Sequence, residues 1–420
     1  MPCTAVFPQG LGGRICATER VILFPGLFPV GSHALAGLVS DIIVQIVCKA
    51  KGFRLPAAGG IHGGVFHLSV PERSGLALIH MVHLQHKTIG KYKTGSVVVL
   101  TRKGSNVYVN GKKAGREVLF APARNVPGFL VKGNKYRGDM KAIPSSWGNG
   151  ITLINVLPME DYLKGVVPSE IVPSWRMDAI KAQAVAARTY ATYHRNGYRS
   201  SGYDVTDDTR TQVYRGFSAE TAAKNRAVSE TAGEGVTYAG KPIDALFHSS
   251  GGGFTENSEN VWGSVIPYLR GVKEESSTYL MTPWKKTMTM ASFTKSLENA
   301  GYKIGDLKSI KLSHLKKGEA NHSSDRGISG RVKSVVFVGK KGRATVSGER
   351  LQRLYGLDST LFDISAKGKE LTITGYGYGH GLGLSQWGAE AMAEKHGDGK
   401  NYYKTILSHY FTGTKIEKIY

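Results

Sequence analysis

Residues 175–195 read WRMDAIKAQAVAARTYATYHR, and this run predicts a long helix. Ser174 stands where an N-cap residue is expected, Asp178 would lie in the first turn, and Gly197 follows the run. Alanines recur from Ala179 to Ala191 and leave the helix with a small surface, so another element can approach it closely. We therefore expect a buried central helix.

Short β-rich runs precede this helix. Residues 96–100, 107–109 and 118–120 are rich in β-branched and aromatic side chains. The Asn110-Gly111 pair between two of these runs predicts a tight hairpin turn. Residues 150–157 continue the strand-rich part of the chain.

The other segments mix both element types. Residues 160–167 have helical spacing, which Pro168 is expected to end. The pattern predicts further strands at 235–238, 243–248, 332–338 and 370–374, and further helices at 219–231, 385–396 and 402–410. Together these predict an α+β fold with a central Ala-rich helix, strand-rich flanking subdomains and a polar groove.

The composition is that of a globular protein with surplus positive charge. Of 420 residues, 41% are hydrophobic, and 55 Lys and Arg against 32 Asp and Glu give a formal net charge of +23. Basic pairs such as Lys316-Lys317 and Lys340-Lys341 are scattered rather than gathered in one block. A diffuse positive surface suits a polymeric anion better than sequence-specific DNA reading, so we expect no nucleic-acid partner. A plain surplus of solvated lysines is the other interpretation.

The N-terminal 90 residues differ from the rest. Cys3, Cys16 and Cys48 lie here and none follows, which removes thiolate zinc sites and structural disulfides from the body of the protein. Residues 21–47 loosely resemble a signal or anchor segment, but prolines and Asp41 interrupt the apolar run. We divide the chain into 1–90 (targeting segment or misassigned start), 91–150 (strand-rich) and 151–420 (core domain).

Glu170 is the first candidate for chemistry. It lies in VVPSEIVP, residues 166–173, where two prolines and apolar neighbours surround its carboxyl group. Burial raises the pKa of a carboxyl group, which makes it a proton donor near neutral pH. Glycosidic bond cleavage needs such a donor at the leaving oxygen. A surface glutamate in a turn is the alternative.

Three other segments carry polar groups. Residues 203–214 hold several aspartates, which suggest a cation site, but they lack the spacing of an EF-hand loop, and a structural loop is the default interpretation. Residues 247–256, FHSSGGGFTE, could line a groove for sugars or form a simple Gly-rich turn. Residues 375–389, GYGYGHGLGLSQWGA, do not fit a dinucleotide fingerprint. A plain structural loop is one interpretation, and the other is a set of aromatic faces for stacking on sugar rings: Tyr376, Tyr378, His380 and Trp387.

Taken together, these segments resemble the SpoIID/LytB family, across most of residues 96–420. Seven motifs occur in the order of that family: NVLPMEDYLKGVVPSE (155–170), KAQAVAARTY (181–190), QVYRG (212–216), HSSGGGFTE (248–256), NVWG (260–263), PYL (267–269) and the run at 375–389. Each motif is modest by itself, and their order makes the signal specific.

The resemblance implies a lytic transglycosylase that cuts peptide-stripped peptidoglycan strands in sporulation-linked wall remodelling. The family's catalytic glutamate falls on Glu170, whose carboxyl group would protonate the leaving oxygen and then take a proton from the muramic 6-hydroxyl. The resemblance implies that the predicted polar groove binds glycan. We expect it to be lined by Lys181, Gln183, Arg188, Gln212, Tyr214, His248, Ser249, Ser250, Glu256, His380, Ser385 and Gln386.

The resemblance also bears on metals, partners and location. Some members hold zinc with cysteines and a histidine, and those cysteines fall near Thr206 and Thr211 of this sequence. The thiols are absent here, so we expect no metal and no cofactor. LytB-like relatives are amidase enhancers, which is the alternative function, and a plain anionic-polymer binding protein is a third. Expected partners are peptidoglycan glycan strands and a wall amidase or other sporulation hydrolase. We expect an extracytoplasmic protein at the cell wall or membrane, with the N-terminus as a candidate membrane attachment.

Overall fold

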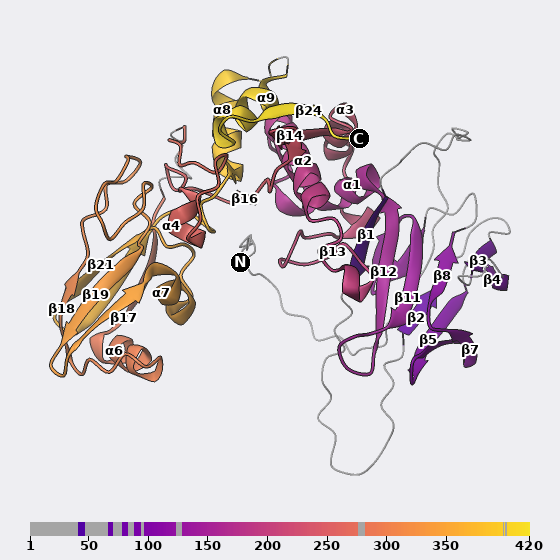
Figure 1. The fold of residues 1–420 in the computed structure, drawn as a ribbon, viewed down its shortest axis with the longest axis horizontal. Coiled ribbons are helices and arrows are strands. Elements are labelled where there is room, and N and C mark those ends of the chain that lie inside the picture. The colour runs from indigo at the N-terminus through magenta and orange to yellow at the C-terminus, as the bar shows by residue number, and fades with distance from the viewer. Residues whose placement is uncertain are drawn as a thin grey trace, which may run out of the picture. The chain divides into compact units, whose positions relative to one another are not determined.

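The structure is a computed structural model, and it describes residues 41–46, 66–69, 78–82, 88–93, 96–122, 128–275, 282–397, 399 and 401–420. The three cysteines and most of the apolar stretch at 21–47 lie outside the described residues. The chain forms two compact units (Figure 1). The β-rich unit contains the described residues up to Glu170 together with 194–233, and the helix-centred unit contains Ile171–Tyr193 and Glu234–Ile419.

A seven-stranded sheet dominates the β-rich unit. Its neighbouring strands are antiparallel, except that β1 and β13 run parallel. Its order is β13 (Val205–Thr206), β1 (Asp41–Ile46), β12 (Ile151–Pro158), β11 (Asp139–Pro144), β8 (Val118–Ala121), β3 (Leu78–Val82) and β4 (Thr88–Lys93).

A second sheet of six strands completes the β-rich unit. Its order is β10 (Asn134–Tyr136), β9 (Phe129–Val131), β2 (Phe66–Ser69), β5 (Val97–Lys103), β6 (Asn106–Val109) and β7 (Lys112–Gly115). Asn110 and Gly111 join β6 to β7, and both have positive φ, 48° and 79°. A two-residue hairpin turn of this kind requires those angles, so the predicted turn is confirmed.

Helix α1 (Met159–Glu170) directly follows the end of β12 and buries Tyr162, Leu163 and Val166. The prediction that Pro168 ends this helix is wrong, because Pro168 lies inside it and the helix continues to Glu170. The fixed φ of proline is compatible with a helix, although the residue lacks an N–H donor and its ring crowds the carbonyl four positions earlier. The Ser169 hydroxyl also donates to the Gly165 carbonyl at 2.9 Å in this last stretch.

The helix predicted at 219–231 is shorter in the structure. Residues Gly216–Ala219 form the 3-10 turn η2, and α3 runs over Ala222–Glu230. The Thr221 residue before α3 has an extended backbone, so the helix cannot begin earlier.

Helix α2 (Met177–Tyr193) is the centre of the other unit, as predicted. Its alanines are almost fully buried, and it packs against β14 (Glu234–Tyr238), α8 (Gln386–His396) and α9 (Tyr402–Tyr410). The expected Ser174 cap is wrong, because the helix begins three residues later. Asp178 instead accepts hydrogen bonds from the Gly399 and Tyr403 amides, at 3.0 and 3.1 Å, which ties the helix start to the C-terminal segment.

Small sheets surround α2. Strand β14 lies between β15 (Lys241–Pro242) and β24 (Lys415–Lys418), and β16 (Phe247–His248) pairs in parallel with β23 (Leu384–Ser385). The latter pair joins two of the sequence motifs directly. The Ser385 side chain caps α8 by accepting a hydrogen bond from the Gly388 amide. Helix α4 (Ser258–Trp262) carries a third motif.

Residues 284–375 form a lobe with its own core, centred on Phe293, Phe337, Phe362 and Leu371. Only the strands near 332–338 and 370–374 were predicted here. The lobe contains one three-stranded sheet of β17 (Trp284–Thr289), β22 (Glu370–Gly375) and β21 (Phe362–Lys367), a second of β18 (Leu307–Lys311), β19 (Ser334–Gly339) and β20 (Arg343–Ser347), and helices α6 (Met290–Asn299) and α7 (Gly348–Tyr355).

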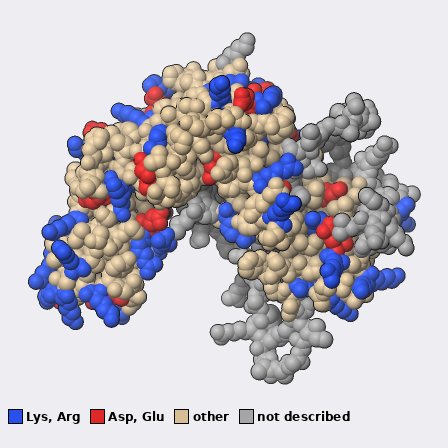
Figure 2. All heavy atoms as spheres, in the orientation of Figure 1, with Lys and Arg blue, Asp and Glu red and all other residues tan. Residues whose placement is uncertain are grey.

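The positive charge is concentrated on this lobe. Lysines and arginines outnumber acidic residues more than twofold between residues 284 and 375, and they gather over the lobe in Figure 2. We call it the basic lobe. In the part of the chain that the structure describes, no helix combines the length and apolarity that a membrane crossing requires.

Candidate functional site

Glu170 is the last residue of α1 and is partly exposed. Its Oε1 accepts a hydrogen bond from the Val213 amide at 3.0 Å. This bond joins the end of the helix to a segment more than forty residues away in the sequence. The carboxyl group is therefore held in place while it stays within reach of solvent.

Two buried tyrosines hold the segment that carries Val213. The Tyr162 hydroxyl donates to Gln212 Oε1 at 3.1 Å, and the Tyr214 hydroxyl donates to Asn155 Oδ1 at 2.8 Å. The two rings lie 5.1 Å apart between centroids. Burial raises the pKa of Tyr214 well above its ordinary value, so this phenol remains a hydrogen-bond donor.

Gly165 allows this packing. A Cβ at this position would lie 2.5 Å from Cε2 of Tyr214, which is closer than real side chains approach. Gln212 and Tyr214, two predicted groove residues, are each 1% exposed. The structure thus brings both residues close to Glu170. They are buried, and they support the Val213 segment that binds the Glu170 carboxyl group.

Thr206 and Thr211, which fall near the cysteine positions of zinc-holding relatives, lie close together. The hydroxyl groups of Thr206 and Thr211 are 2.9 Å apart, and Thr211 also donates to the Thr206 carbonyl at 2.7 Å. Asp208 accepts from the Thr206 hydroxyl and pairs with Arg210. Hydroxyl groups are poor zinc ligands compared with thiolates, so these residues do not fit the metal. Across the described residues, no group of three or more His, Cys, Asp or Glu could hold a metal ion.

The remaining predicted groove residues belong to the helix-centred unit. Lys181, Ser249 and His380 are partly exposed there. The others are buried: Gln183, Arg188, His248, Ser250, Glu256, Ser385 and Gln386. Arg188 illustrates their role, because its Nη1 donates to the Glu234 carbonyl at 3.0 Å and so joins α2 to β14.

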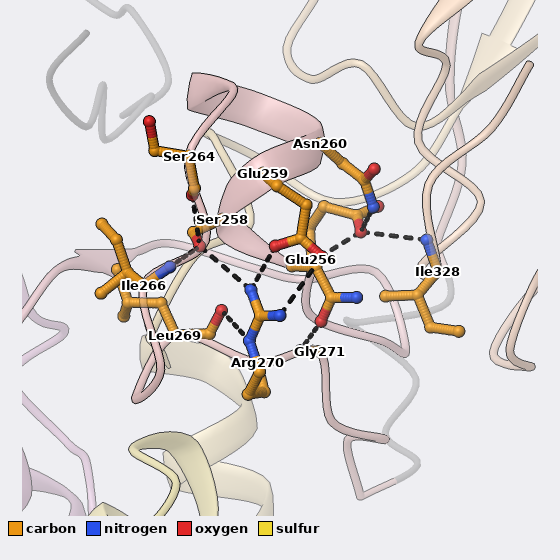
Figure 3. A network of polar contacts seen from close by, with 11 residues as sticks. Glu256, Ser258, Glu259, Asn260, Ser264, Ile266, Leu269, Arg270, Gly271 and Ile328 are labelled. Carbon is orange, nitrogen blue, oxygen red and sulfur yellow. Dashed lines mark hydrogen bonds and ion pairs between the residues drawn. The ribbon is translucent and has the colours of Figure 1, made fainter.

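Glu256 accepts five hydrogen bonds. Its Oε1 accepts from the Asn260 side chain and the Ile328 amide, at 2.9 and 3.0 Å (Figure 3). The same oxygen accepts from the Asn257 amide at 2.8 Å. Its Oε2 accepts from the amide and the hydroxyl of Ser329, at 3.2 and 2.6 Å. The carboxylate is 0% exposed, so it positions the loops around it.

His248 and His380 lie side by side, with ring centroids 5.3 Å apart. His380 Nδ1 accepts from the Leu382 amide at 3.0 Å, so its Nε2 carries the proton and donates to the Phe247 carbonyl at 3.1 Å. Burial, followed by nearby Arg331, lowers the pKa of His380 to about 3. Burial, then His380 and Arg331, also lower the pKa of His248 far below its ordinary value. Both rings are therefore neutral in the folded protein.

Arg331 is the cation beside these rings, and it is 2% exposed. Its Nη1 donates to the Gly251 and Phe254 carbonyls and to the Ser329 hydroxyl, at 3.2, 3.3 and 3.2 Å. Its Nε and Nη2 have no hydrogen-bond partner among the described residues. Burial lowers its pKa, and Glu256 and Glu274 act in the opposite direction.

Acid is expected to destabilise this region because of the two histidines. Their folded-state pKa values are lowered, so below about pH 6.5 the unfolded chain binds protons that the folded chain does not. The free energy of unfolding should fall as the pH drops from about 6.5 towards 3. Glu274 acts in the opposite sense, because burial raises its pKa. Urea unfolding between about pH 4 and pH 7 measures the slope.

The variant His380→Gln should flatten this pH slope. His314→Gln is the matched control, because the His314 side chain is 91% exposed in the same unit. An unchanged slope in His380→Gln would contradict the neutral-ring assignment.

A cavity of about 440 Å³ adjoins this network. Its lining comes from α4, α7, the loop around Arg331 and the run that ends at His380. Several of its residues were absent from the predicted site: Asn260, Trp262, Arg331, Gln352 and Asp358. Trp262 and Asn260 lie in the NVWG motif, which was a usable signal. Arg331, Gln352 and Asp358 carry no local pattern that marks them.

The chain matches known families over the segment that contains Glu170 and over the segment that lines the cavity. Residues 148–238 match the family described as "Stage II sporulation protein", and residues 253–383 match a domain of unknown function (DUF8618). Stage II sporulation protein D of Bacillus subtilis is 34% identical over 282 residues, which cover 62% of this chain and 75% of that protein. The chain belongs to the SpoIID/LytB family.

Two other relatives extend this likeness. An uncharacterised protein of Brachyspira hyodysenteriae is 34% identical over 291 residues, covering 69% of this chain and 74% of the relative. The amidase enhancer of Bacillus subtilis is 32% identical over 294 residues, covering 60% of this chain but 40% of that protein. The stage II sporulation match contains Glu170 and its tyrosine support, whereas the cavity lies within the domain of unknown function.

Proposed function

We propose that this protein is a lytic transglycosylase that cuts peptide-stripped peptidoglycan strands in sporulation-linked wall remodelling. The placement of Glu170 carries the proposal. Its carboxyl group is fixed by the Val213 amide at 3.0 Å and remains partly exposed at the end of α1. A catalytic acid needs both properties, because it must hold its geometry and still reach the substrate. The family resemblance assigns the catalytic glutamate to the same position.

The reaction requires one carboxyl group that acts twice. The protonated Glu170 gives its proton to the glycosidic oxygen as the bond from that oxygen to the muramic C1 breaks. The resulting carboxylate then accepts the proton of the muramic 6-hydroxyl while that oxygen bonds to C1. The products are a strand with a free hydroxyl end and a strand with a 1,6-anhydro end, and the carboxyl group is again protonated.

The surrounding residues support this role indirectly. Tyr162, Gln212 and Tyr214 fix the backbone that holds Glu170, and we assign them a positioning role. In the helix-centred unit, Lys181, Ser249 and His380 are partly exposed, and we propose that they contact glycan. The basic lobe suits attraction to anionic wall polymers, and we propose an extracytoplasmic location at the wall.

The likeness to an amidase enhancer favours one other function. In that case the protein would bind glycan strands and stimulate a separate wall amidase or another sporulation hydrolase. The two functions share the substrate and differ in whether glycosidic bonds break.

Product analysis distinguishes these functions. The full chain is incubated with peptide-free glycan strands, because β1, β2 and β3 near the N-terminus belong to the sheets of the β-rich unit. Mass spectrometry should detect anhydro-muramyl ends that increase with time. Intact strands that nevertheless sediment with the protein would overturn the transglycosylase and favour the enhancer. Reducing ends without anhydro ends would indicate hydrolysis instead.

A further inference from the structure

The cavity in the domain of unknown function has the composition of a carbohydrate site. It has a volume of about 440 Å³, within the range of roughly 300–1,000 Å³ that is typical of small-ligand pockets. We propose that it binds a pyranose ring of an uncharged saccharide, as a glycan subsite separate from the Glu170 carboxyl group. That this ring is an N-acetylated amino sugar rests on the proposed function, whereas saccharide binding rests on the cavity itself.

An aromatic wall is the first feature that points to a sugar. Trp262 ends α4 and is 42% exposed, although it lines the cavity. Its ring centroid lies 6.3 Å from that of His380, and Tyr378 also lines the cavity. Aromatic faces pack against the C–H face of a pyranose ring. The neutral state of His380 adds no charge to this wall.

The polar groups of the cavity suit hydroxyl groups. Asn260 has its amide plane fixed by the bond from Nδ2 to Glu256 Oε1 at 2.9 Å (Figure 3). Gln352 and Asp358 face the cavity from the other segments. Planar amides both donate and accept hydrogen bonds, and carboxylates accept them, so together they match the hydrogen bonds that vicinal hydroxyl groups offer.

The charges of the lining argue against an anionic ligand. Three acidic residues, Glu256, Glu349 and Asp358, line the cavity together with Arg331 and Arg353, and Arg353 already pairs with Glu349 at 3.3 Å. An anion would therefore meet three carboxyl groups against two arginines in the cavity. This lining contrasts with the positive surface of the basic lobe, and it separates a saccharide site in the cavity from any binding of anionic polymers on the lobe.

The cavity is also rigidly built. Glu256 joins α4 to the loop before Arg331 through five hydrogen bonds, and the Gly379 amide donates to the Asp358 carbonyl at 2.9 Å. Gly379 has a φ of 94°, which favours glycine, and a Cβ there would lie 3.1 Å from Cβ of His248. A lining held in one geometry loses little conformational freedom when a ligand binds.

The test is a titration of the full chain with the tetramer of N-acetylglucosamine, by calorimetry. Trp262→Ala should weaken binding about tenfold or more, as expected for an aromatic anchor. Gln352→Ala on α7 should weaken it as well and covers the case in which the tryptophan variant misfolds. Trp147→Ala is the matched control, because Trp147 is 79% exposed in the β-rich unit and should leave the affinity unchanged.

The outcomes separate this proposal from the transglycosylase. If the wild type does not bind the tetramer, or if Trp262→Ala and Gln352→Ala both bind as tightly as the wild type, the saccharide subsite is wrong. If inorganic phosphate binds in the cavity and the tetramer does not, an anion site replaces the saccharide subsite. Tetramer binding that depends on Trp262 in a protein that cuts no strands would uphold the subsite while the proposed reaction fails.

Discussion

Glu170→Gln is expected to lower the rate of strand cleavage by about 10²–10⁴-fold, because a glutamine cannot give or accept the transferred proton. The fold should be unaffected. A glutamine side-chain oxygen can still accept the Val213 amide bond that holds Glu170. The measurement is the initial rate of anhydro-muramyl end formation from peptide-free glycan, with sedimentation of the variant with the strands as a test of retained binding.

Glu160→Gln is the matched control for this variant. Glu160 lies on the same helix, and its Oε1 also accepts a backbone amide from a distant segment, that of Gly233 at 3.0 Å. The two substitutions therefore make the same chemical change in similar surroundings. Full activity of Glu170→Gln, or an equal loss in both variants, would refute the assignment of Glu170 as the acid and base.

Glu256→Gln is expected to lower the free energy of unfolding by about 3–5 kcal/mol. All five hydrogen bonds at this carboxylate come from donors, so a glutamine NH₂ group must face at least two of them. Each buried donor left without an acceptor costs about 1–3 kcal/mol. The loss of negative charge would also leave the buried Arg331 without one of its compensating carboxylates. Urea unfolding measures the effect.

Glu259→Gln provides the comparison in the same network. Glu259 pairs with Arg270 near the surface, where both side chains are partly exposed (Figure 3). Pairs of this kind contribute about 0–1 kcal/mol, so the variant should unfold close to the wild type. Similar losses of unfolding free energy in both variants would show that Glu256 contributes no more to stability than the surface pair does.

Local patterns sufficed for the elements whose signals lie within a few residues. The Asn110-Gly111 turn follows from the positive φ that both positions require, and α9 begins and ends where the sequence predicts. The lobe helices α6 and α7 were missed, although Thr289 and Ser347 cap them and Phe293 and Leu297 have helical spacing. Each of these helices buries only two large apolar side chains, Phe293 and Leu297 in α6 and Leu351 and Tyr355 in α7, so its periodic signal is weak.

The candidate site divides in the same way. Its motifs and Glu170 could be found in the sequence, because chemistry-bearing residues recur there in a recognisable order. The sequence could not show which of these residues are buried supports. Gln212 and Ser385 are polar residues that look like ligand contacts, but tertiary packing encloses them and uses their hydrogen bonds internally.

By itself, the sequence determined the central helix, the hairpin, the family motifs and the position of Glu170, because these depend on neighbouring residues and on residue type. Only the tertiary structure decided that the Val213 amide fixes Glu170 and that α4, α7 and the Arg331 loop enclose one cavity. These arrangements join segments tens of residues apart. The hydrogen bonds and burial that set them arise only after the chain has packed.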